Sequence, residues 1–293
     1  MTILAHLSDL HLIERDHLKR RGLSRTRLQF LSFGAPLDAE ARLARATALL
    51  QQARRSGADH VLITGDLTED GTPAQFEVLA EVLHKSRLDP DCVTLVPGNH
   101  DGYSEPGAFG RALEGSLSAF RRTSAGDATS VLSGAVIVPL STMIEGQWFT
   151  SSRGVVQHAD LARVRRIASD PISRDRAVVV AQHHPPSHHP VFAVEWIDGV
   201  SNALAMHELM QERTRVHVLH GHTHRRATRH LSGRAHAQVF SAASVRDQHL
   251  ESLRLYKAEG GSLHELQGAL ATPQLAAARR ARSKPLTLNP SPL

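Results

Sequence analysis

Short apolar runs rich in β-branched residues recur along this chain, and polar residues follow several of them at once. Near-continuous apolarity over four to six residues is typical of strands that are covered on both faces. The sequence therefore predicts a sheet core with other layers packed against it. Such runs occupy residues 2–7, 60–64, 92–96, 135–140, 177–182, 215–220, 237–242 and 252–257.

Amphipathic helical patterns separate several of these runs, at residues 39–56, 73–86, 159–169 and 202–213. The second begins with Thr72 as a predicted N-cap and Pro73 at the first helical position. Alternation of strand and helix predicts an α/β fold with parallel pairing in the first half. The last two or three strands are joined by short connections, so we expect them to be antiparallel.

The length of 293 residues suits one large domain or two small ones. No internal repeat and no linker precedes about residue 270, so we expect a single domain over residues 1–265. The basic, proline-containing end, residues 270–293, has a composition typical of a disordered tail.

Polar motifs follow five of the predicted strands: "SDLH", "TGDL", "PGNHD", "QHHPP" and "GHTH". Ligands of open α/β sheets bind beyond the carboxyl ends of the strands, so these motifs should converge at one edge. Asp9 and His11 stand two residues apart, which points both side chains to one side of an extended chain, and His222 and His224 repeat that spacing. Glycines precede the ligands where the chain must turn sharply or approach closely, at Gly65, Gly98 and Gly221.

These motifs are rich in oxygen and imidazole groups, which suit a hard to borderline divalent metal such as Mn, Fe, Zn, Ni or Co. The single cysteine, Cys92, excludes an internal disulfide and a cysteine-based zinc site. Seven candidate ligands are too many for one ion and fit two ions that share a carboxylate, an arrangement that clamps phosphorus for in-line attack.

Together, in this order, the motifs resemble the calcineurin-like metallophosphoesterase family over residues 8–224. The resemblance implies a four-layer sandwich of two mixed β-sheets flanked by helices, with a dimetal site at the carboxyl ends of the strands. It implies that Asp9, His11 and His224 hold one ion, that Asn99, His183 and His222 hold the other, and that Asp66 bridges them. The cofactors would be two divalent ions, with Mn or Fe expected and Zn, Ni or Co as alternatives.

The same resemblance makes His100 a catalytic residue rather than a ligand. It would stabilise the transition state and protonate the leaving alkoxide, with Asp101 fixing its orientation. The spacing His-x-Pro selects His183 over its neighbour His184, which we expect to support the site from behind. His188 and His189 are interpreted as solvated loop residues.

Departures from known branches of the family indicate the reaction. The chain lacks the arginine of "GDxVDRG" found in protein phosphatases, and Glu69 stands where purple acid phosphatases have a tyrosine. It most resembles bacterial phosphodiesterase-like members, including cyclic-nucleotide phosphodiesterases. We therefore expect hydrolysis of a phosphodiester by in-line attack of a metal-bridging hydroxide. The alternatives are a phosphomonoesterase or pyrophosphate hydrolase acting on a nucleotide or lipid headgroup, and a non-catalytic scaffold.

The calculated isoelectric point near 10 comes from two segments, because residues 14–27 and 271–293 each carry a net charge of +4 and the rest carries −3. We do not expect nucleic acid as a partner, and expect a small phosphoester substrate instead. The absence of a signal peptide before Ser8 and of long apolar runs predicts a cytoplasmic protein.

Residues 12–37 form an insert between the first motif and the first long helix, far longer than a usual strand-to-helix loop. It must begin at the rim of the metal site. Three interpretations remain: a helix packed on the flank of the domain, a lid over the site, and a peripheral membrane or lipid contact. We expect Arg20, Arg21 and Arg25 to favour a bulky anionic substrate if the insert is a lid.

Overall fold

A computed structural model of the chain describes residues 1–187, 199–231, 237–247 and 252–266. The expected disordered tail, residues 270–293, and the two histidines His188 and His189 lie outside this part. The described strands are β1 (Thr2–Leu7), β2 (His60–Thr64), β3 (Val93–Val96), β4 (Ser130–Val131), β5 (Ala135–Pro139), β6 (Gly154–Val155), β7 (Ala177–Ala181), β8 (Val200–Ser201), β9 (Val216–His220), β10 (Ala227–His230), β11 (Ala237–Ser241), β12 (Arg254–Glu259) and β13 (Ser262–Leu266).

The described α-helices include every helix that the sequence predicts, with boundaries within two residues of the prediction. Pro73 begins α3 as expected, although the side chain of Thr72 makes no capping hydrogen bond. The helices are α1 (Gly22–Leu31), α2 (Ala39–Arg55), α3 (Pro73–Ser86), α4 (Ala108–Glu114), α5 (Arg121–Ser124), α6 (His158–Ser169) and α8 (Ala203–Glu212).

Two mixed sheets form the centre of the molecule. The first has the order β13-β12-β1-β2-β3, in which β1, β2 and β3 are parallel and β12 is antiparallel to β1. The second has the order β10-β11-β9-β7-β5-β4, in which β5, β7, β9 and β11 are parallel. All the strands that precede the five polar motifs therefore lie in parallel pairs.

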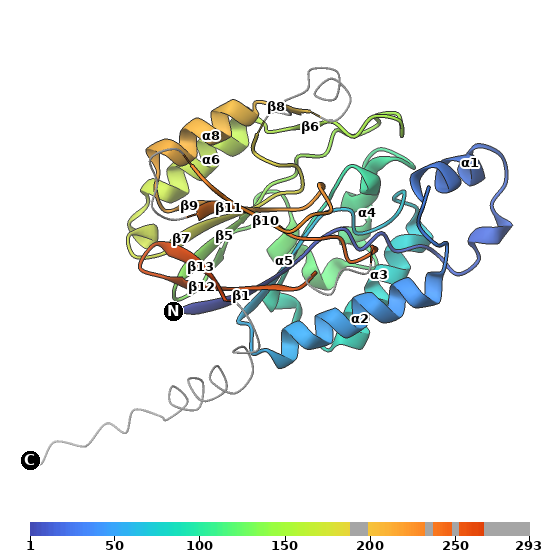
Figure 1. Cartoon of the computed structure of the whole chain (residues 1–293), viewed down its shortest axis with the longest axis horizontal. Helices are drawn as coiled ribbons and strands as arrows, with labels where there is room; N and C mark the ends of the chain where they lie inside the picture. Colours follow the sequence, from blue (N-terminus) through green and yellow to red (C-terminus); the bar gives the residue numbers. More distant parts are fainter. Residues whose placement is uncertain (188–198, 232–236, 248–251, 267–293) are drawn as a thin grey trace, which may run out of the picture.

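The sheets pack face to face, and helices cover their outer faces. Leu4, Leu62, Ile137 and Val179 belong to the apolar cluster that both sheets share. Figure 1 shows α2 and α3 on one side of the sheets and α6 and α8 on the other. This confirms the expected four-layer α/β sandwich.

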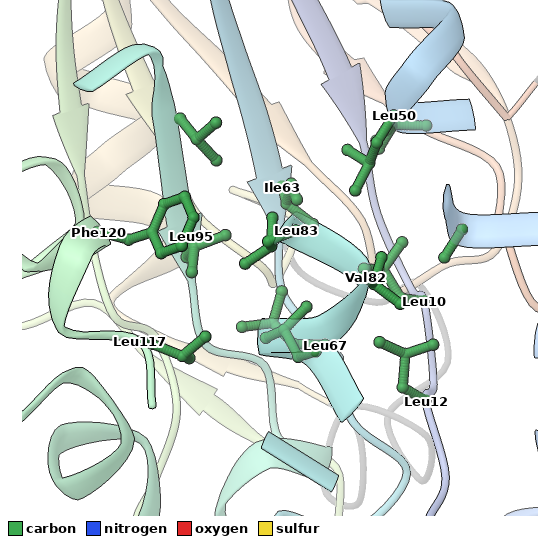
Figure 2. Packing of buried hydrophobic residues seen from close by; sticks show 14 of the residues in the cluster. Leu10, Leu12, Leu50, Ile63, Leu67, Val82, Leu83, Leu95, Leu117 and Phe120 are labelled. Atoms are coloured by element: carbon green, nitrogen blue, oxygen red, sulfur yellow. The ribbon is translucent and has the colours of Figure 1, made fainter. Parts of the chain in front are cut away.

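The apolar clusters between each sheet and its covering helices account for the helical spacing of apolar residues in the sequence. In Figure 2, Leu83 of α3 lies beside Ile63 of the first sheet and Val82 lies beside Leu10, and all four are buried. On the opposite side, the buried faces of α6 and α8 pack on the valines of β5, β7 and β9. Each helix buries one stripe, as the spacing of its apolar residues requires.

The expectation of antiparallel pairing at the end of the chain is only partly correct. β12 and β13 are antiparallel, but β11 pairs in parallel with β9. The antiparallel neighbour of β11 is β10, an exposed strand with the sequence "ATRH" that carries no apolar run to mark it. Edge strands of this kind leave little trace in a hydrophobic pattern.

The insert at residues 12–37 forms a short 3₁₀ helix (His17–Lys19) and the helix α1. Leu28 is the buried residue of α1, and it packs with Ile13 and Ala39 in a small separate cluster. Figure 1 shows α1 at the outer end of the molecule, beyond α2 and α4. Within the described residues, no helix combines the length and the apolarity that crossing a membrane would require.

Candidate dimetal site

The loops that follow β1, β2, β3, β7 and β9 meet at one edge of the two sheets. Backbone hydrogen bonds tie them together directly. The amide of Asp9 donates to the carbonyl of Gly65 at 3.0 Å, and the amide of Gly221 donates to the carbonyl of His183 at 3.0 Å. Parallel strands place their carboxyl ends at the same edge, so residues more than 200 positions apart become neighbours.

The first group of side chains consists of Asp9, His11, Asp66 and His224, whose ligand atoms all lie within 4.8 Å of one another. The Nε2 atoms of His11 and His224 are 3.2 Å apart. His224 Nε2 lies 3.3 Å from Asp9 Oδ1, and His11 Nε2 lies 3.7 Å from Asp66 Oδ2. Two imidazoles and two carboxylates therefore face a common centre.

The second group joins the first through Asp66. Its Oδ2 atom lies 3.3 Å from His183 Nε2, which is also 3.1 Å from Asn99 Oδ1 and 3.3 Å from His222 Nδ1. His183 Nδ1 donates to the carbonyl of Thr64 at 2.8 Å, which turns Nε2 toward this centre. The structure thus brings together all seven side chains that the sequence singled out as ligands.

Backbone strain is concentrated at the same residues. Five of the seven described non-glycine residues with positive φ are Asp9, His11, Asp66, His222 and His224. Left-handed conformations are unfavourable for residues with a Cβ atom, and they persist where a function or the surrounding structure holds them. The strain therefore marks these five positions independently of their chemistry.

Two glycines allow the loops to approach this closely. A Cβ atom at Gly98 would collide with the carboxylate and amide nitrogen of Asp66, and one at Gly221 would collide with Ser8 and Asp9. Both glycines precede candidate ligands, as the sequence predicted. Their role is close approach to the carboxylates.

The electrostatics of the site favour added positive charge. Burial alone would lower the pKa of His224, but the Asp9 carboxylate and the hydrogen bonds to Asp247 and Asp9 outweigh burial and raise it to about 10. Burial is likewise outweighed at His183, where Asp66 and Asp9 raise the pKa to about 9. Either protons on these imidazoles or metal cations can balance the buried carboxylates. The donor set fits divalent ions, because it offers carboxylate, amide and imidazole atoms without a thiolate.

His100 lies beside this centre, with its Nε2 atom 3.9 Å from Asp66 Oδ2. Its Nδ1 atom donates to the carbonyl of Glu69 at 2.7 Å, which fixes the ring and turns Nε2 toward the site. The structure gives Asp101, which we expected to fix the orientation of His100, a set of backbone and hydroxyl partners. The buried Asp101 carboxylate accepts hydrogen bonds from the amides of Leu67, Thr68 and Gly98 and from the Thr68 hydroxyl.

The 3₁₀ turn at His100–Gly102 directs the buried Asp101 side chain into the protein. Asp101 therefore clamps the loop after β2 to the loop after β3. Burial, together with the nearby Asp66 charge, raises the pKa of Asp101 to about 6. Asp101 influences His100 only through the backbone that both share.

His184 is fully buried behind the site and uses both ring nitrogens for hydrogen bonds. Its Nε2 atom donates to the carbonyl of Ser152 at 3.0 Å, and its Nδ1 atom lies 2.8 Å from the hydroxyl of Thr142. The spacing rule that selected His183 over His184 thus agrees with their hydrogen bonding. His184 anchors the segment around Ser152 to the loops of the candidate site.

Sequence reasoning missed several residues that support the site. Asp247 Oδ2 accepts from His224 Nδ1 at 2.7 Å, and Arg246 lies against both Asp247 and Glu69. Tyr103 accepts a hydrogen bond from Asn99 Nδ2 at 2.7 Å and donates to the carbonyl of Ser151 at 2.8 Å. Only Tyr103 carried a signal, because it follows Asn99 by four residues in the same motif.

Comparison with known proteins agrees with this architecture. A family model described as calcineurin-like phosphoesterase matches residues 3–226. The chain belongs to the calcineurin-like phosphoesterase family, and this membership implies a metal-dependent hydrolase of phosphoesters. No curated protein shows significant sequence similarity to the chain.

Among solved structures, the chain is similar to a dimetal phosphatase from Danio rerio, with a TM-score of 0.63 and 14% identity over 90% of this chain and 98% of that chain. It is also similar to a protein of Thermus thermophilus, with a TM-score of 0.55 and 11% identity over 91% of this chain and 98% of that chain. At such low identity these similarities establish the fold alone.

Proposed function

We propose that this protein is a phosphodiesterase that uses two divalent metal ions. The observation that carries the proposal is the position of Asp66, whose Oδ2 atom lies 3.7 Å from His11 on one side and 3.3 Å from His183 on the other. A carboxylate between two groups of imidazole, amide and carboxylate ligands suits a shared pair of ions. Mn or Fe is expected, with Zn, Ni or Co as alternatives.

In this proposal, Asp9, His11 and His224 hold one ion, Asn99, His183 and His222 hold the other, and Asp66 bridges them. When bound, such ions supply Lewis acidity at the phosphoryl oxygens and a nucleophile derived from water at neutral pH. The protein residues fix the positions of the ligand atoms. Thr64 orients His183 through its carbonyl, and Asp247 orients His224 through its carboxylate.

His100 has the geometry of a general acid in this reaction. Its Nδ1–H donates to the carbonyl of Glu69, so a proton on Nε2 faces the site and can be given to a leaving alkoxide. The same charged ring would stabilise negative charge that develops on the phosphoryl group. Asp101 belongs to this machinery as a positioning residue that holds the two loops together.

The preference for diesters rests on the charges around the site. A phosphate monoester carries a second negative charge that a further free cation would match. Arg246 is one nearby arginine, but its guanidinium contacts Asp247 at 2.9 Å and Glu69 at 3.5 Å. Because these carboxylates already balance its charge, Arg246 contributes little to the binding of a dianionic substrate.

The alternative is a phosphomonoesterase or pyrophosphate hydrolase acting on a nucleotide or lipid headgroup. The similarity to a protein described as a dimetal phosphatase favours this second function. A cytoplasmic location is part of the main proposal, supported by the single cysteine, since reducing compartments disfavour disulfides.

Hydrolysis of matched aryl substrates tests the proposal. After loading with Mn²⁺, the protein should turn over an aryl phosphodiester faster than the corresponding monoester at neutral pH. The panel should extend to cyclic nucleotides, glycerophosphodiesters and sugar-nucleotide lipids. Faster turnover of the monoester would make the alternative the better description, and no turnover of any phosphoester would reject both.

A further inference from the structure

Exposed apolar side chains are concentrated in the insert and in the segment that packs against it. Of the eight large hydrophobic residues that are exposed in the described part of the chain, four lie in the insert between residues 18 and 33, and a fifth is Trp148. Phe33 is 90% exposed and Trp148 is 58% exposed. Isolated exposed hydrophobic residues are ordinary, but a contiguous group of them marks an interaction surface.

Aromatic contacts join the two segments into one surface. Phe30 of α1 meets Phe149 edge to face, with ring centroids 5.4 Å apart, and Trp148 lies against Phe149 at 4.8 Å. Leu23 lies seven residues before Phe30 and therefore on the same edge of the helix. We call Leu23, Phe30, Phe33, Trp148 and Phe149 the apolar patch.

The helix α1 is held to the protein by its opposite side, which leaves the apolar patch free. Leu28 is buried, and Arg20 and Arg27 donate to the fully buried carboxylate of Asp70. These contacts bury the side of α1 that faces the protein. The outward residues Leu23 and Phe30 are more than half exposed.

The segment that carries α1 is rich in basic residues. Residues 17–37 contain five lysines and arginines and no acidic residue. The side chains of Arg20 and Arg27 are neutralised by carboxylates, whereas Arg21 is exposed and donates to the carbonyls of Leu18 and Arg20. Arg25 is also exposed, and within the described part of the chain no ion pair includes either Arg21 or Arg25.

The apolar patch is coupled to the rim of the site at both of its ends. Trp148 and Phe149 precede Ser151 and Ser152, whose carbonyls accept from Tyr103 and His184. On the other side, Asp70 follows Glu69, whose carbonyl holds His100. A surface bound by the apolar patch would therefore lie at the edge of the candidate site.

We propose that the apolar patch, together with Arg21 and Arg25, docks the protein reversibly on an anionic lipid bilayer. Phenylalanine, leucine and tryptophan side chains beside exposed cations are the composition that inserts into the interface of anionic membranes. Residues 17–37 contain no acidic side chain that would repel the anionic headgroups of such a bilayer. This docking does not depend on the proposed hydrolysis, and it would bring lipid phosphoesters to the site if that hydrolysis holds.

The test is partitioning of the full chain onto vesicles of phosphatidylcholine with and without phosphatidylglycerol, measured by flotation without turnover. The wild-type protein should bind the anionic vesicles preferentially, and less so as salt rises, because salt screens exposed charges. The double variants Phe30→Ser/Phe33→Ser and Arg21→Ser/Arg25→Ser should each lower partitioning by about tenfold.

Matched controls replace exposed residues elsewhere. Ile172→Ser/Leu204→Ser removes two exposed apolar side chains, and Arg54→Ser/Arg55→Ser removes two exposed arginines from α2; both should bind as the wild type does. The basic residues between 279 and 284 stay in every protein and contribute equally. Since all these side chains are exposed, thermal melting should confirm that each variant is folded.

Three outcomes would overturn the proposal. The first is equal binding of the wild type to neutral and anionic vesicles, or no binding to either. The second is unchanged partitioning of both Phe30→Ser/Phe33→Ser and Arg21→Ser/Arg25→Ser, which would place any membrane affinity in another part of the chain. The third is a dimer in sedimentation equilibrium that Phe30→Ser/Phe33→Ser dissociates, because a second copy would then be the occupant of the apolar patch.

Discussion

At the scale of single residues, Asp66 and His100 have separate roles in the candidate site, one in binding metal and the other in catalysis. Asp66 faces both groups of ligands, so Asp66→Ala should lose both metal ions. His100 lies outside both groups, so His100→Ala should keep the metals and lower kcat by about 100- to 10,000-fold. Elemental analysis after Mn²⁺ loading should find about two ions per wild-type chain. Loss of metal from His100→Ala, or retention of most of its rate, would contradict the assignment.

Tyr103 decides which way the amide of Asn99 points. Its hydroxyl donates to Ser151 and must therefore accept from Asn99 Nδ2, which leaves Asn99 Oδ1 directed at His183. Tyr103→Phe removes that acceptor, so one of the two ions should bind about tenfold more weakly. A Mn²⁺ titration measures this, and restoration of activity by excess Mn²⁺ would distinguish a positioning role from misfolding.

The chain provides a matched control, because it has only one other tyrosine. Tyr256 is buried between the sheets, and its hydroxyl lies 3.4 Å from Nδ1 of His6, which is not a candidate ligand. Tyr256→Phe should leave Mn²⁺ affinity unchanged. Equal loss of affinity in both variants would show that Tyr103 acts through general stability.

The seven candidate ligands could be found from the sequence because each stands at the end of an apolar run in a short motif. Their partners could not be found in that way. Asp247 lies 23 residues after His224 and reaches it only because β11 returns beside β9. The hydrogen-bond partners of Asp101 could not be found in that way either, since adjacency in sequence does not determine which way a 3₁₀ turn points its side chains.

At the scale of elements, the insert is predictable in length and charge but not in the roles of its arginines. Arg20, Arg21 and Arg25 form one basic group in the sequence. In the structure, Arg20 is nearly buried and pairs with Glu14 and Asp70, whereas Arg21 and Arg25 are exposed. A substitution that includes Arg20 would therefore damage the attachment of α1 as well as any surface for an anionic ligand.

That attachment gives a direct prediction. Arg20→Met removes the ion pair with Glu14 and one of the two guanidinium groups from the buried Asp70, so unfolding should require about 3 kcal/mol less free energy. Arg21→Met, at an exposed position, should change stability by less than about 0.5 kcal/mol. Urea denaturation of the two variants measures the difference. Equal stabilities would mean that Arg27 alone is sufficient to hold α1.

At the scale of the whole molecule, the four layers bury several histidines far from the outer surface. His60 on β2 is one of them, with its Nε2 atom 2.8 Å from the hydroxyl of Thr94. Burial penalises its charged form and lowers its pKa to about 4. His6 and His220 are also buried, and desolvation is the main reason that their pKa values are lowered. The sandwich therefore keeps these imidazoles neutral.

This predicts a fold that loses stability in mild acid. In the unfolded chain each such histidine binds a proton near pH 6.5, whereas His60 in the folded protein does so only near pH 4. The stability that neutral His60 contributes is therefore complete above pH 6.5 and is lost as the pH falls toward 4. At pH 5, His60 alone should cost about 2 kcal/mol relative to pH 7.5. Denaturation at the two pH values should show a smaller loss in His60→Gln than in the wild type. His84 is exposed, so the control variant His84→Gln should lose as much stability between the two pH values as the wild type does. An equal loss of stability in all three proteins would mean that the acid sensitivity has another origin.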